Sequence, residues 1–213
     1  MKLVCISDTH GDHRKVDLPD GDVLVHAGDV TAHGTEQDFL DFLEWFDAFP
    51  HPHKLFVAGN HDRFLEQCPT LARDHVRKSD VTWLNDSGVS IDGVHFWGSP
   101  ITLRFHDWSF MRESGRDIGK HWALIPDTTD VLITHGPPHG VLDLVQRRDG
   151  SEEQTGCAQL LDTVLKVGPS VHIFGHIHEE YGVYAENGIE FLNVSTMNQS
   201  YRIANAPVVY HLG

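Results

Sequence analysis

At 213 residues the chain can bury one sizeable hydrophobic core, and domains of this size commonly stay undivided, so we expect a single domain over residues 1–213. Asp and Glu number 31 against 16 Lys and Arg, and a formal charge of -15 repels phosphate backbones unless local cations intervene, which argues against tracking along extended nucleic acid. Three irregularly spaced cysteines favour a reducing compartment, and no apolar run resembles a signal peptide or membrane span, so we expect a cytoplasmic protein without a membrane partner.

Five short apolar runs that end at Asp, Gly or His are typical of buried strands. A capping pair, Thr35 and Asp38, stands before Phe and Leu residues that recur at helical spacing as far as Pro50, which predicts an amphipathic helix between the second and third strands. A second helix is predicted over residues 156–167, where a Gly-Pro pair follows. The five predicted strands cover residues 2–7, 22–26, 54–58, 130–134 and 170–174.

Two hairpins are predicted from dipeptides that favour type I′ turns, Asp92-Gly93 and Asn187-Gly188, each placed between two β-type segments. Strands that alternate with helices, followed by strands paired in hairpins, indicate mixed sheets whose outer faces are covered by helices. The stretch 105–120 is rich in aromatic residues without any period, and we expect it to be an ordered loop near the functional face.

Short polar motifs follow most of the apolar runs, and each alone is compatible with an ordinary turn. Their joint occurrence at successive strand ends predicts a two-metal site, because two adjacent cations need a bridging carboxylate and several further donors. The donors are carboxylates, an amide and imidazoles without a thiolate, which suits Mn, Fe, Zn, Co or Ni rather than a structural zinc cage. The motifs are Asp8-x-His10, Gly28-Asp29, Gly59-Asn60-His61-Asp62, Thr134-His135-Gly136 and Gly175-His176-x-His178.

These motifs resemble the pattern D-x-H, G-D, G-N-H-D/E, H and G-H-x-H of the calcineurin-like metallophosphoesterases, with every position present from Asp8 to His178. The longer strings over residues 134–138 and 174–182 are similar to the small metallophosphodiesterases of bacteria, phages and animal brain. The resemblance implies the metallo-dependent phosphatase fold, an α/β (α+β) four-layer αββα sandwich of two mixed β-sheets flanked by helices. Its site would lie at the carboxyl ends of the strands.

The resemblance also implies roles for the motif residues. Two divalent metal ions would share Asp29 as a bridge, and a hydroxide between them would attack phosphorus. His61 would act near the leaving oxygen and Asp62 would orient it, which makes these two the catalytic candidates. One ion would be held by Asp8, His10, Asp29 and His178, and the other by Asp29, Asn60, His135 and His176.

Substrate contacts are predicted from residues outside the motifs. His139 lies four residues after His135 in a Gly-Pro-Pro loop, and His33 follows Gly28-Asp29. Arg104 precedes aromatic residues that could form a wall for a nucleotide, although loop anchoring is an alternative role for this segment. A basic step at residues 147–148, Arg147-Arg148, could meet an anionic substrate or simply begin a solvated helix.

The function predicted from these observations is hydrolysis of phosphodiester bonds in small nucleotides, cyclic ones included, because the acidic charge favours small substrates over polymeric ones. Three alternatives stay open: a nuclease or RNA-end-processing phosphoesterase, a phosphomonoesterase, and a metal-binding scaffold without catalysis. A basic groove would favour the nuclease, and the sequence does not show one.

Overall fold

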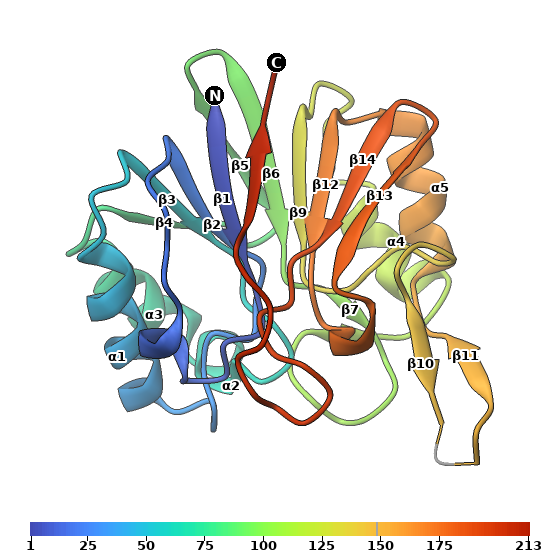
Figure 1. Cartoon of the computed structure of the whole chain (residues 1–213), viewed down its shortest axis with the longest axis horizontal. Coiled ribbons are helices and arrows are strands. Elements are labelled where there is room, and N and C mark those ends of the chain that lie inside the picture. The colour runs from blue at the N-terminus through green and yellow to red at the C-terminus, as the bar shows by residue number, and fades with distance from the viewer. Residues whose placement is uncertain (148) are drawn as a thin grey trace.

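The strands predicted from the apolar runs form two sheets in the computed structural model, which describes residues 1–147 and 149–213 (Figure 1). The five predicted ranges correspond to β1, β2, β3, β9 and β12, and the observed bounds differ from them by one or two residues. Further strands come from the two hairpins and from the C-terminal segment, which returns beside β1.

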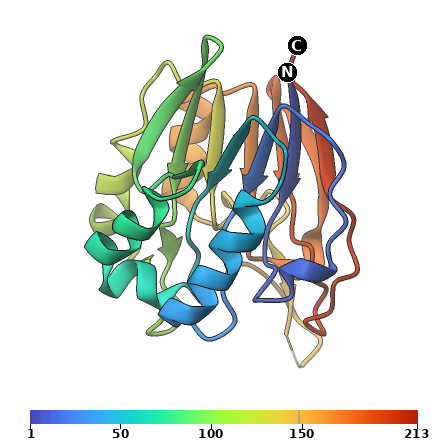
Figure 2. The same ribbon diagram turned by 90° about the vertical axis from the view of Figure 1, so that its left-hand side faces the viewer.

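The first sheet has the strand order β15-β1-β2-β3-β4, in which only β15 is antiparallel to its neighbour. Figure 2 shows the light-blue helix α1 in front of this sheet, on its outer face. The strands are β1 (Lys2–Ile6), β2 (Val23–His26), β3 (His53–Phe56), β4 (Val81–Trp83) and β15 (Val208–His211), and the helical segments on this side are η1 (His13–Lys15), α1 (Glu36–Asp47), α2 (Arg63–Gln67) and α3 (Pro69–Val76).

The second sheet has the order β13-β14-β12-β9-β6-β5, with parallel pairing at its centre and an antiparallel hairpin at each edge. Helices α4 (Arg116–Trp122) and α5 (Ala158–Val167) cover its outer face in Figure 1. The strands are β5 (Ser87–Ile91), β6 (Val94–Ser99), β9 (Val131–Thr134), β12 (Val171–Phe174), β13 (Gly182–Glu186) and β14 (Ile189–Asn193); two small pairs, β7 (Thr102–Leu103) with β8 (Met111–Arg112) and β10 (Leu144–Gln146) with β11 (Glu152–Gln154), and η2 (His178–Glu180) complete the chain.

Because side chains alternate between the two faces of each sheet, both faces are apolar. Each sheet packs against the other on one face and against helices on the other, which gives four layers. On β1, Leu3 and Cys5 belong to the apolar core between the sheets, whereas Val4 and Ile6 belong to the core shared with the helices. Successive residues of a strand point to opposite faces, so each central strand contributes to both cores. The predicted αββα sandwich of two mixed sheets is confirmed.

The helix signals of the sequence are confirmed with small shifts. Thr35 caps α1 as half of a capping box, because its Oγ1 accepts from the Asp38 backbone N–H while the Asp38 carboxylate accepts from the Thr35 N–H. The second predicted helix begins at Ala158, two residues late, and ends where Gly168 adopts a left-handed conformation. No helix in the described part of the chain is both long and apolar enough to cross a membrane.

The two hairpin turns are also confirmed, since both central residues of each turn have positive φ, as a type I′ turn requires. The expectation of a continuous loop over residues 105–120 is wrong in part, because this stretch contains β8 and the start of α4. Arg147 follows β10 in a hairpin and does not begin a helix, while Arg148 lies outside the described residues.

A fully buried histidine lies on the helix-covered face of each sheet, His26 on β2 and His172 on β12. His172 Nε2 lies 2.8 Å from Thr134 Oγ1, and His26 Nε2 lies 3.0 Å from Thr9 Oγ1. Burial disfavours the imidazolium and lowers the pKa of each of these histidines to about 3. Both are therefore neutral packing residues in the folded chain.

This burial predicts loss of stability in mild acid. The folded-state pKa of His172 lies below its ordinary value of 6.5, so protonation favours the unfolded chain. The stability that the neutral, buried imidazole gives the folded chain is therefore lost as the pH falls from about 6.5 toward about 3. In His172→Leu, the drop in unfolding free energy between about pH 7.5 and about pH 5.5 should be smaller than in the wild type by about 1 kcal/mol. Urea unfolding measures this, with the exposed His211→Leu as a control; an unchanged pH dependence in His172→Leu would contradict the assignment.

Candidate metal centre

The motif residues lie at the carboxyl ends of β1, β2, β3, β9 and β12, where the two sheets approach each other. Beyond β1 and β14 the sheets are joined directly, because Ser7 and Ser195 form a parallel bridge and the Thr196 N–H donates to Ser7 O. Strand ends from both sheets therefore supply side chains to one place.

Unusual backbone conformations accompany these side chains. Four of the candidate ligands, Asp8, His10, Asp29 and His176, have φ values of 55°, 41°, 54° and 71°. Positive φ is uncommon outside glycine, and such conformations persist only where surrounding contacts enforce them. The chain turns sharply after each strand and aims these side chains back across the strand ends.

Glycines in the motifs make room for the ligands. A Cβ at Gly28 would collide with the His135 imidazole, and one at Gly59 would collide with the Asp29 carboxylate. At Gly175 it would collide with the Asp8 carboxylate and with Ser7. These three positions need glycine because the backbone of one motif passes directly against a ligand of another.

The first group of donors is formed by Asp8, His10 and His178, whose ligand atoms all lie within 4.8 Å of one another. His178 Nε2 lies 3.5 Å from Asp8 Oδ1 and 3.4 Å from His10 Nε2. Asp8 Oδ1 is buried and has no hydrogen-bond partner in the described chain, whereas Asp8 Oδ2 accepts from the His176 N–H and the Ser195 hydroxyl. An ionised oxygen left unpaired among imidazoles is the arrangement that a cation would satisfy.

Asp29, His135 and His176 form a second such group. His135 Nε2 lies 3.3 Å from Asp29 Oδ2 and 3.0 Å from Asn60 Oδ1, so an amide oxygen joins this group. Asp29 Oδ2 also lies 3.8 Å from His10 Nε2 of the first group. The structure thus brings all seven predicted ligands together, with Asp29 between the two groups.

The donors of the first group differ in protonation. Burial lowers the pKa of His178, but the Asp8 carboxylate outweighs it and holds this pKa above its ordinary value. Burial lowers the pKa of His10 to about 4, which leaves its imidazole neutral with a free lone pair. Burial opposes ionisation of Asp8 and Asp29 as well, but His178 and His135 respectively outweigh it and hold the pKa of each carboxyl below its ordinary value. A cation bound at this group would displace the proton of His178 and would find Asp8 ionised and His10 neutral.

His135 balances this negative charge. Burial lowers its pKa, but Asp29 raises it by more, to about 9, so its imidazolium compensates the buried carboxylates. Its Nδ1 donates to Ala27 O at 2.9 Å, which leaves Nε2 facing Asp29. A cation bound there would take over the charge compensation and leave the same ring oriented as a ligand.

His61 lies directly beside both donor groups. The His61 N–H donates to Asp29 Oδ1 at 2.8 Å, and its ring packs edge-on between the rings of His10 and Trp108, each 4.6 Å away. Its ligand atom also lies within 4.8 Å of those of His10 and Asp29, so proximity alone does not separate a catalytic role from a ligand role.

The prediction that Asp62 orients the His61 ring directly is wrong. Both Asp62 oxygens are instead used by other groups: Oδ1 accepts from the Thr31 N–H and hydroxyl, and Oδ2 accepts from the N–H groups of Val30 and Gly59. Burial, together with Asp29, raises the pKa of Asp62 to about 6. Asp62 therefore fastens the loops that carry Asp29 and His61, and it affects the His61 ring only through the backbone.

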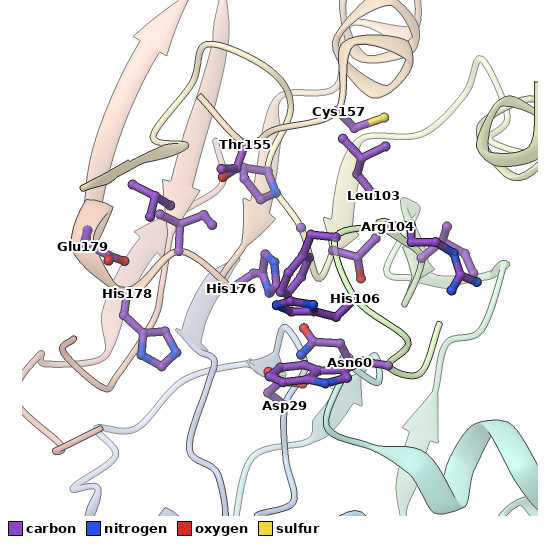
Figure 3. Close-up of a pocket in the computed structure, with 18 of the residues that line it drawn as sticks. Asp29, Asn60, Leu103, Arg104, His106, Thr155, Cys157, His176, His178 and Glu179 are labelled. Atoms are coloured by element: carbon purple, nitrogen blue, oxygen red, sulfur yellow. The ribbon is translucent and has the colours of Figure 1, made fainter. Parts of the chain in front are cut away.

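Five of the seven predicted ligands line one end of a cavity of about 430 Å³ (Figure 3): His10, Asp29, Asn60, His176 and His178. Of the predicted substrate contacts, Arg104 lines this cavity, as do its aromatic neighbours Phe105, His106 and Trp108. His33 and His139 are not among the lining residues. The His33 side chain is 81% exposed beside Asp38, and the His139 side chain is 45% exposed near Asp143. The structure therefore supports a cavity position for one of the three candidates.

Three residues of the site come from a segment that the motif pattern does not include, the turn after β14. Ser195 donates to Asp8, and the Asn198 carbonyl accepts from His178 Nδ1 at 3.2 Å. The Tyr201 ring lies 5.2 Å from that of His10 and 5.0 Å from that of His178 and lines the cavity. The signal for this segment was its polar run directly after an apolar strand, the same pattern as in the recognised motifs.

Comparisons with known proteins agree with this geometry. A family model described as calcineurin-like phosphoesterase matches residues 1–180. The whole chain is 39% identical to a UPF0046 protein of Caenorhabditis elegans, of which it covers 75%. It is 36% identical to metallophosphoesterase domain-containing protein 1 of Homo sapiens, over 99% of this chain and 71% of the human protein. The crystal structure of TT1561 of Thermus thermophilus shares the fold, with a TM-score of 0.61, 11% identity, and coverage of 90% of this chain and 88% of that one.

The glycine contacts predict that Gly175→Ala weakens metal binding, because the added Cβ displaces Asp8 from His178. Removing support for a ligand typically costs about tenfold or more in metal affinity. Competition with a fluorescent chelator measures this. Gly119→Ala, a helical position with open space around the new Cβ, is the matched control and should bind metal like the wild type. Equal affinity in the two variants would contradict the prediction.

Proposed function

Because the chain belongs to the calcineurin-like phosphoesterases, hydrolases that use two divalent metal ions, we propose that it is a phosphodiesterase acting on small nucleotides, cyclic ones included. The observation that carries this proposal is the pair of adjacent donor groups at one end of an aromatic-walled cavity, with Asp29 Oδ2 of the second group 3.8 Å from His10 Nε2 of the first. A cavity of about 430 Å³ has the size of a small-ligand site rather than of a polymer groove.

The proposed ligands follow the two donor groups, with Mn, Fe, Zn, Co or Ni as candidate ions. When bound, two such ions would lower the pKa of a water nucleophile and neutralise phosphate charge. Asp29 lies between the groups and is the proposed bridge. The first ion would be held by Asp8, His10, Asp29 and His178, and the second by Asp29, Asn60, His135 and His176.

His61 is the proposed catalytic residue of the chain itself. Its ring lines the cavity beside His10, and its backbone is fixed to Asp29, so it faces the same space as the donor groups. An imidazolium at this place can donate a proton to the departing ester oxygen. Asp62 supports it by fastening the backbone of the loop.

Charge supports small substrates over RNA. The cavity lining includes Arg104 and Arg147, and each pairs with a carboxylate, at 2.9 Å to Glu113 and 2.6 Å to Glu153. A chain of net charge -15 with its cavity arginines paired has little to attract a polyanionic backbone. The three free thiols support the further proposal of a reducing, cytoplasmic location.

His61→Ala is expected to lower turnover by roughly 10² to 10⁴-fold while leaving metal content nearly unchanged, because the variant loses a proton donor and keeps all seven proposed ligands. Metal stoichiometry and the hydrolysis rate are measured on the same preparation. His10→Ala, which removes a proposed ligand, should lose both. A parallel loss of metal and rate in His61→Ala would identify His61 as a ligand.

Metal-dependent diesterase activity is the second expected outcome. After chelation, the protein should hydrolyse bis-p-nitrophenyl phosphate and cyclic nucleotides only when Mn²⁺, Zn²⁺ or Ni²⁺ is restored, with p-nitrophenyl phosphate a poorer substrate. Preference for the monoester would support the phosphomonoesterase alternative, and preference for short RNA would support the nuclease. Absence of metal-dependent hydrolysis from the whole panel would favour the scaffold.

A further inference from the structure

The cavity continues beyond the metal-binding residues into a part that we call the apolar annex. In Figure 3, Leu103 and Cys157 lie at the end of the cavity opposite Asp29 and Asn60, with His106 between the two ends. Residues of β7, α4, β10 and α5 meet there. The apolar annex is lined by Ile101, Leu103, Trp122, Val145, Cys157 and Leu160.

The apolar annex reaches into the hydrophobic core. Ile101, Trp122, Cys157 and Leu160 are each at most 3% exposed and belong to the core between the second sheet and its helices. Val145, by contrast, is half-buried and comes from the β10–β11 hairpin. A hollow that ends on core side chains, yet opens onto the metal-binding end, is shaped to take an apolar group joined to a phosphate.

Charge at the edge of the apolar annex does not favour a second anionic group. Two arginines that line the cavity, Arg104 and Arg147, are already paired with Glu113 and Glu153. Burial of an unpaired charge beside Trp122 and Leu160 would be costly. The group that fits is uncharged.

We propose that the apolar annex binds one ester group of the substrate, an uncharged apolar group such as an aromatic ring, while the phosphate lies at the metal-binding end. This inference rests on the proposed function, because it assigns the phosphate to that end of the same cavity. It makes the ester group, rather than the phosphate, the part of the substrate that the protein selects.

Filling the apolar annex tests the proposal. Val145→Trp adds bulk inside it, while Gln146→Trp, the exposed next residue of β10, adds the same bulk on the opposite face of the strand. The probes are phenylphosphonate and methylphosphonate, which cannot be hydrolysed at their P–C bond. The metal-loaded wild type should bind phenylphosphonate about tenfold more tightly than methylphosphonate, because the ring leaves water.

In Val145→Trp the preference for phenylphosphonate should disappear while the affinity for methylphosphonate stays unchanged, and Gln146→Trp should keep the preference. Leu103→Phe fills the apolar annex from β7 and should repeat the result if Val145→Trp does not fold, as thermal unfolding will show. Equal weakening of both phosphonates, or a preference that survives both filling variants, would overturn the proposal.

These binding results stand apart from catalysis: if phosphonate selectivity follows the prediction and no diester is hydrolysed, the proposed function fails and the apolar annex stands.

Discussion

The buried carboxylate of Asp29 is the feature on which the rest of the site depends. It lies between two donor groups and its Oδ1 also holds the His61 backbone, so ligands from both sheets are arranged around one ionised group. An ionised carboxylate in the interior is stable only with nearby positive charge. Within the chain itself, His135 supplies that charge, and this explains why its ring lies against Asp29.

Close packing around Asp29 accounts for the local backbone. Glycine is required at Gly28 and Gly59, where neighbouring motifs pass against the ligands, and Asp29 itself adopts a positive φ. Such strained turns hold only when other bonds fix them, and the four hydrogen bonds accepted by Asp62 perform this role for the loops on either side. Asp62 is therefore best understood as a structural support for Asp29 and His61.

The sequence could predict the features that depend on neighbours in the chain. The Thr35 cap and the two type I′ turns are local, and the ligands follow strands that are recognisable from their apolar runs. Contacts between distant segments were not predictable in this way: Ser195 meets Asp8 across 187 positions, and only the topology shows it. His139, predicted as a substrate contact, does not line the cavity. Its proximity to His135 in the sequence does not fix the direction of its side chain in a turn.

The two ends of the cavity are built from different parts of the fold, and this separates reaction from selection. The metal-binding end combines strand ends of both sheets, so a change in any of these loops disturbs ligands from the others. The apolar annex belongs to the second sheet's helices and to the β10–β11 hairpin, which lies outside both main sheets. Substitutions such as those at Val145 can therefore change the shape of the annex without moving Asp29. An architecture of this kind allows the reaction to be kept while the substrate varies.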